Sequence, residues 1–76
     1  MKIEILGPGC PKCANLEAHV NRALAELNKS AEVIKVTDIN AMIDKGVIQT
    51  PALIIDGKIV SQGKVLSAEK IKQLIG

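Results

Sequence analysis

The residues of this chain with the clearest capacity for chemistry are its two cysteines, Cys10 and Cys13, in the segment GPGCPKC. Two thiols at this spacing can form a dithiol–disulfide couple, half of a metal site, or a structural disulfide. Proline and glycine surround the pair and a helix-like run follows it. The pattern therefore places both thiols at the start of a predicted helix.

The structural disulfide has the least physical support of these three uses. A bridge across two intervening residues closes a very small loop, for which the chain-entropy model gives only about 2 kcal/mol. A metal site is the stronger rival, since two thiolates suffice for Cu(I), whereas a structural zinc ion needs four ligands. The sequence favours a redox couple and keeps a CxxC metal-binding protein, for Cu(I) or zinc, as the alternative.

The composition limits the functions open to the chain. It has 76 residues, no Phe, Tyr or Trp, and a formal net charge of +2, so we expect one domain over residues 1–76 with an aliphatic core. Nucleic-acid binding is disfavoured, because no aromatic side chain can stack on a base. No apolar run approaches the ~20 residues of a membrane span, and no signal peptide is recognisable. We therefore expect a cytoplasmic protein that has no membrane association and no cofactor.

Two patterns predict the strands. Enrichment in β-branched residues and alternation of polarity are typical of strands, and they predict strands at 2–6, 31–36, 51–55 and 58–62. The last two flank Asp56-Gly57, a strong signal for a tight hairpin. The third and fourth strands are therefore expected to be antiparallel.

Helical periodicity and capping residues predict three helices, at 11–28, 37–46 and 67–75. Pro11 suits the first turn of its helix, where a missing N–H is harmless. Thr37 or Asp38 is expected to cap the second helix and Gly46 to end it. Ser67 is expected to cap the third helix.

The resulting order, βαβαββα, indicates the topology. A strand, a helix and a strand in succession favour a parallel pair with a right-handed crossover, whereas the hairpin is antiparallel. The sequence therefore predicts an α/β fold in which helices cover both faces of a mixed four-stranded sheet.

This order, the CxxC motif at the first strand-to-helix turn and Thr50-Pro51 before the third strand resemble the thioredoxin/glutaredoxin superfamily. The chain is most similar to the small thioredoxin-like redox proteins of archaea and bacteria that carry a G-x-G-C-x-x-C start. The resemblance covers essentially the whole chain. It implies a thioredoxin-like fold and a thiol–disulfide oxidoreductase. Its implied partners are disulfide-containing client proteins and a flavin- or ferredoxin-linked thioredoxin reductase, with glutathione less favoured.

The resemblance also implies roles for single residues near the third strand. Pro51 is expected to follow a cis peptide bond and to face the disulfide. Thr50 is expected to offer backbone groups that pair with an extended substrate segment. Both residues are therefore candidates for substrate binding.

At the cysteine motif we expect Cys10 to be the nucleophile. Helix-terminal N–H groups and the cation of Lys12 favour a thiolate at this position, and the segment Gly7-Pro8-Gly9 before it turns the chain sharply so that the sulfur stays uncovered. Lys12, Pro11 and Gly9 are therefore expected to support the site. Cys13, one turn further on the apolar side, is expected to resolve the mixed disulfide. No metal ligand is assigned.

Glu4 and His19 are weaker candidates. Glu4 stands six residues before the first cysteine, about where thioredoxins keep a buried acid that helps deprotonate the second one. A surface or half-buried strand carboxylate is the favoured interpretation, with proton relay as the alternative. His19 falls on the polar side of its helix with Asn15, Arg22 and Glu26, so we expect it to be solvated.

Overall fold

Four strands and three helices follow one another in the predicted order βαβαββα. The structure is a computed structural model that describes residues 1–9 and 11–76. Its elements are β1 (Lys2–Leu6), α1 (Pro11–Glu26), β2 (Glu32–Val36), α2 (Ile39–Asp44), β3 (Ala52–Ile55), β4 (Lys58–Gln62) and α3 (Ala68–Ile75). The predicted fold class is confirmed.

The helices are shorter than predicted because their flanking residues act as caps. Past the last turn of α1, Asn28 has a left-handed φ of 54°. Asp38 precedes α2 as its N-cap, and its side chain accepts a hydrogen bond from the backbone N–H of Asn40 at 3.0 Å. Beyond α2, Gly46 has a φ of +82°, which an L side chain adopts only with strain. Ser67 caps α3, as predicted.

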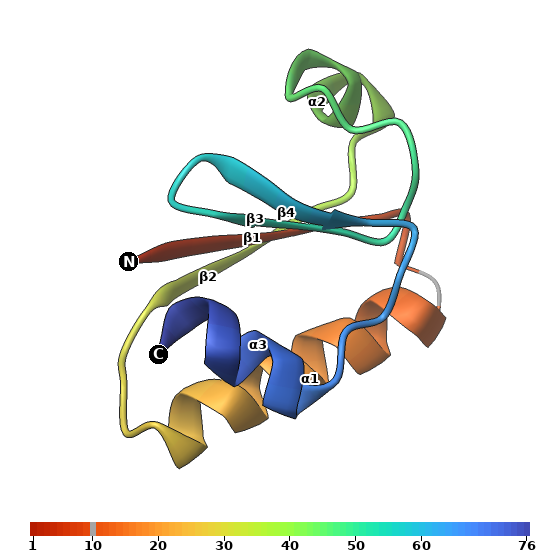
Figure 1. Cartoon of the computed structure of the whole chain (residues 1–76). Helices are drawn as coiled ribbons and strands as arrows, with labels where there is room; N and C mark the ends of the chain where they lie inside the picture. Colours follow the sequence, from red (N-terminus) through yellow and green to blue (C-terminus); the bar gives the residue numbers. More distant parts are fainter. Residues whose placement is uncertain (10) are drawn as a thin grey trace.

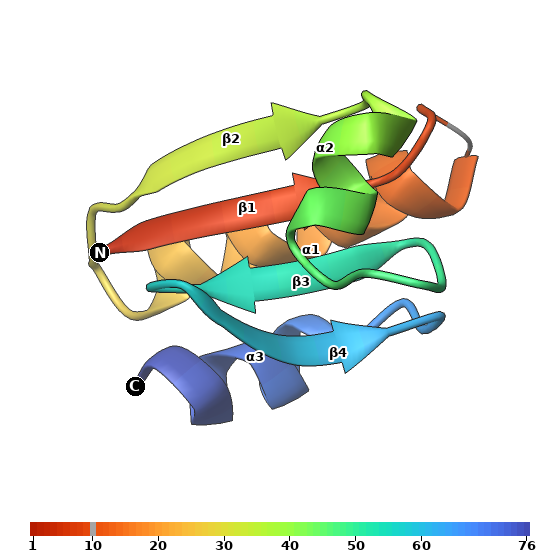
Figure 2. The same ribbon diagram turned by 90° about the horizontal axis from the view of Figure 1, so that it is seen from above.

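The sheet has the strand order β2-β1-β3-β4 (Figure 2). β1 and β2 are parallel, whereas β3 is antiparallel to both of its neighbours, β1 and β4. The hairpin turn contains Asp56 and Gly57 at φ 51° and 84°, the mirror-image turn that matches the twist of the flanking strands. β1 is one of the two inner strands of the sheet, and the chain passes from its end into the cysteine loop.

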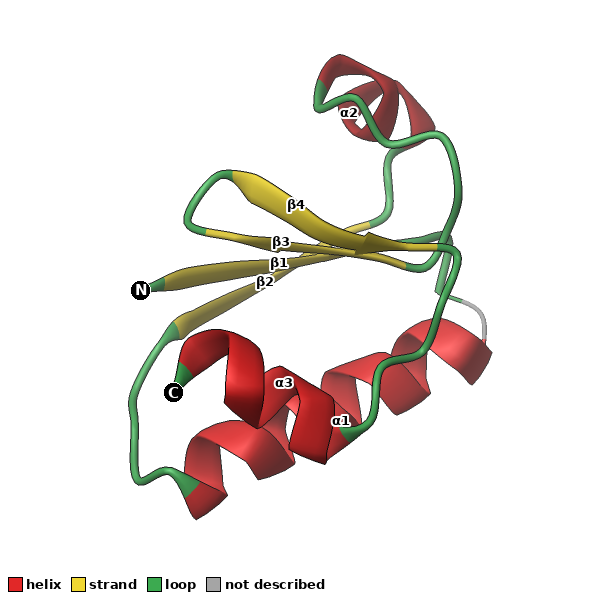
Figure 3. Cartoon of the chain, viewed as in Figure 1, coloured by secondary structure: helices red, strands yellow, loops and turns green. Residues whose placement is uncertain are grey.

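The helices cover both faces of the sheet, with α1 and α3 on one face and α2 on the other (Figures 1 and 3). Ile3 and Ile5 of β1 pack in the cluster that contains the buried residues of α1 and α3. Leu6 packs on the opposite face with Met42 of α2. β1 is therefore buried from both sides, and its last residue leads directly into the loop before α1.

Candidate active site

The loop that joins β1 to α1 carries the CxxC motif. Cys10 lies outside the described residues, so its role as the nucleophile stays a prediction. Its neighbours Gly9, Pro11 and Lys12 are exposed, and α1 begins at Pro11. An exposed ammonium in the first turn acts through solvent and is screened by salt. Lys12 can therefore supply only a modest electrostatic effect.

Cys13 lies in the first turn of α1 and is 7% exposed. It starts the buried stripe that continues through Leu16 and Val20, both fully buried, as the helical periodicity predicts. Cys13 therefore lies where the exposed first turn of α1 meets the buried face of the helix.

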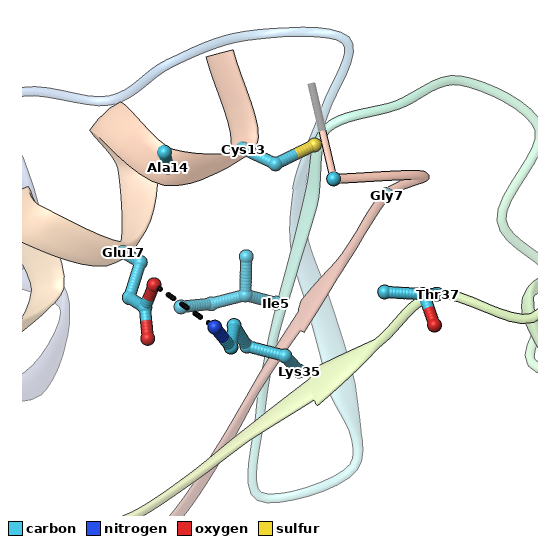
Figure 4. Close-up of a pocket in the computed structure, with 8 residues that line it drawn as sticks. Ile5, Gly7, Cys13, Ala14, Glu17, Lys35 and Thr37 are labelled. Carbon is cyan, nitrogen blue, oxygen red and sulfur yellow. Dashed lines mark ion pairs between the residues drawn. The ribbon is translucent and has the colours of Figure 1, made fainter. Parts of the chain in front are cut away.

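Gly7 shapes the space around this thiol. It is buried, and its N–H donates to the carbonyl of Val36 at 2.9 Å. Figure 4 shows the sulfur of Cys13 pointing toward Gly7, and a Cβ at Gly7 would overlap the Cys13 Sγ. The sequence pattern marks this glycine only as part of a turn. The signal that could have found it is a glycine placed directly after a buried strand.

Pro51 also lies close to Gly7. The Thr50–Pro51 peptide bond is cis, Pro51 is fully buried, and its Cα would lie 3.9 Å from a Cβ at Gly7. The antiparallel register pairs Leu6 with Ala52, so the end of β1 meets the start of β3. Thr50 is exposed. The fold thus brings Cys13, Gly7 and Pro51 together.

A cavity of about 110 Å³ lies beside Cys13 (Figure 4). Its lining comes from β1, α1, β2 and two loops: Ile5, Gly7, Gly9, Cys13, Ala14, Glu17, Lys35 and Thr37. Glu17 follows Cys13 by four residues on α1, and its Oε1 lies 3.5 Å from Nζ of Lys35 on β2. Four residues apart is the spacing at which side chains meet on a helix. Glu17 was not predicted as a site residue, although its spacing from Cys13 could have indicated it, whereas Lys35 reaches the cavity only through tertiary packing.

The interpretation of Glu4 as a proton relay is not supported by the geometry. Side chains alternate along a strand, so Glu4 shares the α2 face of the sheet with Leu6 and not the α1 face that carries Cys13. Glu4 is 6% exposed and its Oε1 lies 2.9 Å from Nζ of Lys45, just after α2. Glu4 is more deeply buried than expected, and it ties α2 to the sheet.

The prediction that His19 is solvated is wrong. Its Nδ1 lies 2.8 Å from the carbonyl oxygen of Leu66, in the loop before α3, and the contact is partly buried. The helix pattern placed His19 on a polar face, but it could not show that a backbone carbonyl from a distant loop lies within hydrogen-bond distance of its ring. His19 therefore fastens this loop to α1.

An ion-pair network of Arg22, Glu26 and Lys72 joins α1 to α3, away from the cavity beside Cys13. The carboxylate of Glu26 accepts hydrogen bonds from Nε of Arg22 at 2.7 Å and from Nζ of Lys72 at 3.0 Å. These bonds, first that from Arg22 and then that from Lys72, lower the pKa of Glu26. The same carboxylate raises the pKa of both cations. The side chain of Arg22 is largely exposed and those of Glu26 and Lys72 are partly exposed, so the contribution of these ion pairs to stability is small.

The described residues contain neither a cluster of metal-ligating side chains nor a helix that could cross a membrane. No three His, Cys, Asp or Glu side chains within 1–9 and 11–76 gather closely enough to hold a metal ion. No helix in the same residues has the length and apolar character to cross a membrane.

Comparisons with known proteins agree with this geometry. A family model described as thioredoxin domain matches residues 1–76. A protein named thioredoxin from Methanocaldococcus jannaschii is 45% identical over 71 residues, which cover 93% of this chain and 81% of that protein. Another protein of that name, from Methanothermobacter thermautotrophicus, is 36% identical over 75 residues, with coverages of 99% and 97%.

Proposed function

The chain belongs to the thioredoxin domain family and has a thioredoxin-like redox function, and from this premise we propose that it reduces protein disulfides through Cys10 and Cys13. The observation that carries the proposal is the setting of Cys13, a buried thiol that lies against Gly7 and close to Pro51. A metal-binding protein remains the alternative that the experiments below must exclude.

The proposed reaction has two exchange steps. The thiolate of Cys10 attacks one sulfur of a client disulfide, which forms a mixed disulfide and releases the first client thiolate. Cys13 then loses its proton and attacks the Cys10 sulfur, which forms the internal disulfide and releases the second client thiolate. The client gains two electrons and the protein loses two. A flavin- or ferredoxin-linked reductase would return the protein to the dithiol, with glutathione as a less favoured reductant.

Two features of the described residues support Cys10 as the attacking cysteine and Cys13 as the resolving cysteine. α1 begins at Pro11, directly after Cys10 in the sequence, and the unpaired N–H groups of a helix start favour an anion. The burial of Cys13 keeps it from reacting with solvent oxidants before the first exchange has occurred. Thr50 lies exposed next to Pro51, so its backbone is accessible to an extended client segment.

A trapping experiment tests the assignment of the two cysteines. Cys13→Ser should accumulate mixed disulfides with an oxidised client, because the resolving thiol is absent, whereas Cys10→Ser should accumulate few. Mass spectrometry of acid-quenched, alkylated protein measures both. Equal trapping by the two variants would contradict the assigned order of attack.

A redox titration tests the couple itself. The wild-type protein should form a reversible internal disulfide with a potential between about −180 and −300 mV, the span of comparable dithiol proteins. Two free thiols after equilibration with oxidised glutathione would refute the proposal. Sub-micromolar retention of Cu(I) without disulfide turnover, in a parallel copper and zinc binding assay, would favour the metal-binding alternative.

A further inference from the structure

The side chain of Gln62, the last residue of β4, is hydrogen-bonded to the loop before β3. Its Oε1 accepts from the backbone N–H of Ile48 at 2.8 Å and from that of Gln49 at 3.3 Å. Neither of these two donors belongs to a helix or a strand, and Thr50 follows them directly. One side-chain oxygen therefore binds two backbone groups of a loop that has no regular secondary structure.

The residue after β4 contacts the same loop at two further points. The N–H of Gly63 donates to the carbonyl of Pro51 at 2.9 Å. Gly63 has a φ of +71°, and a Cβ at this position would overlap the side chain of Gln49. The end of β4 is thus attached to the residue before Thr50 and to the residue after it, and Figure 2 shows this end of β4 beside the loop.

A β-bulge interrupts the pairing of β3 with β4 just before Gln62. The pairs on the two sides of the bulge are Ile54 with Ile59 and Leu53 with Ser61. Two consecutive residues of β3 therefore face residues of β4 that are two positions apart. Val60, the residue between them, is the extra residue of the bulge.

The bulge determines which face of the sheet Gln62 reaches. Residues that pair in an antiparallel ladder share a face, and Gln62 pairs with Ala52, which packs with Met42 of α2. With regular pairing beyond Ile54, Ser61 would lie opposite Ala52 and Gln62 would lie on the other face. The bulge therefore directs Gln62 to the α2 face of the sheet, from which its side chain reaches the loop.

We propose that Gln62 is a positioning residue for client binding, because it holds the loop so that the backbone of Thr50 can pair with an extended client segment. The inference rests on the proposed disulfide reductase function and deepens it by a residue that takes no part in the exchange of sulfurs. Without the Gln62 oxygen, the N–H groups of Ile48 and Gln49 lose their acceptor. The client must then order the loop as it binds, which lowers its affinity.

The test compares two variants with the wild type. Gln62→Met has a side chain of similar length without an oxygen acceptor, whereas Gln62→Glu keeps an acceptor oxygen in the same place. Reduced full-length protein is mixed with a homodimeric peptide disulfide, whose cysteine lies within an extended segment, and separately with cystine, which has no such segment. Quenched-flow alkylation gives the second-order rate constants.

Gln62→Met should react about tenfold more slowly than the wild type with the peptide, since two hydrogen bonds that order the loop are lost. Its rate constant with cystine should be unchanged. Gln62→Glu should stay within about twofold of the wild type with both disulfides. If circular dichroism shows that Gln62→Met is unfolded, Gln62→Thr takes its place, because threonine suits a strand and is too short to reach the loop.

Amide hydrogen exchange, followed by NMR, measures the same role without a client. The amides of Ile48 and Gln49 should exchange about tenfold faster in Gln62→Met than in the wild type, and should keep their protection in Gln62→Glu. Gln73→Met, at an exposed position of α3, is the matched control. It should change neither these amides nor the two rate constants.

Three results would overturn the proposal. The first is a folded Gln62→Met protein that reacts with the peptide as fast as the wild type. The second is an equal loss of rate with the peptide and with cystine, which would indicate general damage to the site. The third is a Gln62→Glu protein that is as slow as Gln62→Met. Absence of exchange between the wild type and both disulfides would instead refute the proposed function, and the amide exchange would still show whether Gln62 orders the loop.

Discussion

Replacing Gly7 with alanine tests whether the space beside Cys13 is as tight as the structure indicates. A Cβ at Gly7 would overlap the Cys13 Sγ and would lie 3.9 Å from the Cα of Pro51. Gly7 is not among the glycines with positive φ, so alanine can adopt its backbone conformation. The effect of the substitution is therefore steric, and the sulfur is the group that must move.

The expected change in the free energy of unfolding on Gly7→Ala is the sum of two opposing effects. Forcing an extra methyl into a packed site destabilises by about 1–3 kcal/mol, whereas replacing glycine with alanine at a permitted conformation stabilises by about 0.4–1 kcal/mol through the unfolded chain. The net loss should be about 1–2 kcal/mol. For a domain of this size that lowers Tm by about 4–16 °C.

A double-mutant cycle distinguishes this contact from a general loss of packing. In a Cys13→Ala background the sulfur is absent, and the remaining Cβ would lie 3.4 Å from the new methyl, within ordinary contact distance. Gly7→Ala should then be neutral or slightly stabilising, with a coupling of about 1–2 kcal/mol. Thermal unfolding of the reduced proteins measures all four corners of the cycle.

Gly57→Ala in the β3–β4 turn is the control. Gly57 has a φ of +84°, and a Cβ at this position would have no atom within 4 Å, so the substitution strains the backbone far from the cysteine. It should destabilise equally with and without the Cys13 sulfur. The steric reasoning fails if Gly7→Ala lowers Tm by the same amount in both backgrounds.

Three further predictions concern charges. Lys12→Ala should slow alkylation of Cys10 at neutral pH by less than tenfold, and by less at high salt, because an exposed charge is worth at most about 1 kcal/mol; an unchanged rate would remove Lys12 from the site. Glu17→Gln leaves the neighbouring lysine without its partner in the cavity of Cys13. The positive charge of that lysine should then favour the thiolate of Cys13, so Glu17→Gln should speed the second exchange by less than tenfold at low salt. The rate of release of the second client thiol measures this step, and a slower rate or one independent of salt would contradict the prediction. The lowered pKa of Glu26 gives stability that is present above the unfolded pKa and lost as pH falls through the folded pKa. The Tm of wild type should thus fall more than that of Glu26→Gln below about pH 4.5, and parallel Tm curves would refute the assignment.

Local patterns predicted the elements and their order because each signal lies within a few residues. The spacing of Leu16, Val20 and Leu24 repeats with the period of a helix, and these residues line the buried face of α1. Asp56 and Gly57 adopt the left-handed conformations that their turn requires. The helices and turns can thus be predicted from short-range steric and capping preferences.

Features that depend on distant partners could not be predicted this way. The alternation in KIEIL puts Glu4 on the face opposite Ile3 and Ile5, but it does not show that α2 covers that face and buries the carboxylate. Its partner Lys45 follows α2 and lies far from Glu4 in the sequence. His19 likewise looks solvent-facing from its helix pattern, and only the fold brings the carbonyl of Leu66 to its ring.

The two glycines of the segment GPGCPKC show why a sequence pattern can find a site and still miss what shapes it. Gly9 has a φ of +87°, and a Cβ there would meet only open space, so its role is conformational. Gly7 needs no unusual φ, but it lies where the end of β1, the first turn of α1 and the start of β3 meet. From the sequence alone, both glycines are interpreted as parts of the same turn. Only the packing shows that Gly7 is needed for its missing side chain, because any Cβ there would displace the thiol of Cys13.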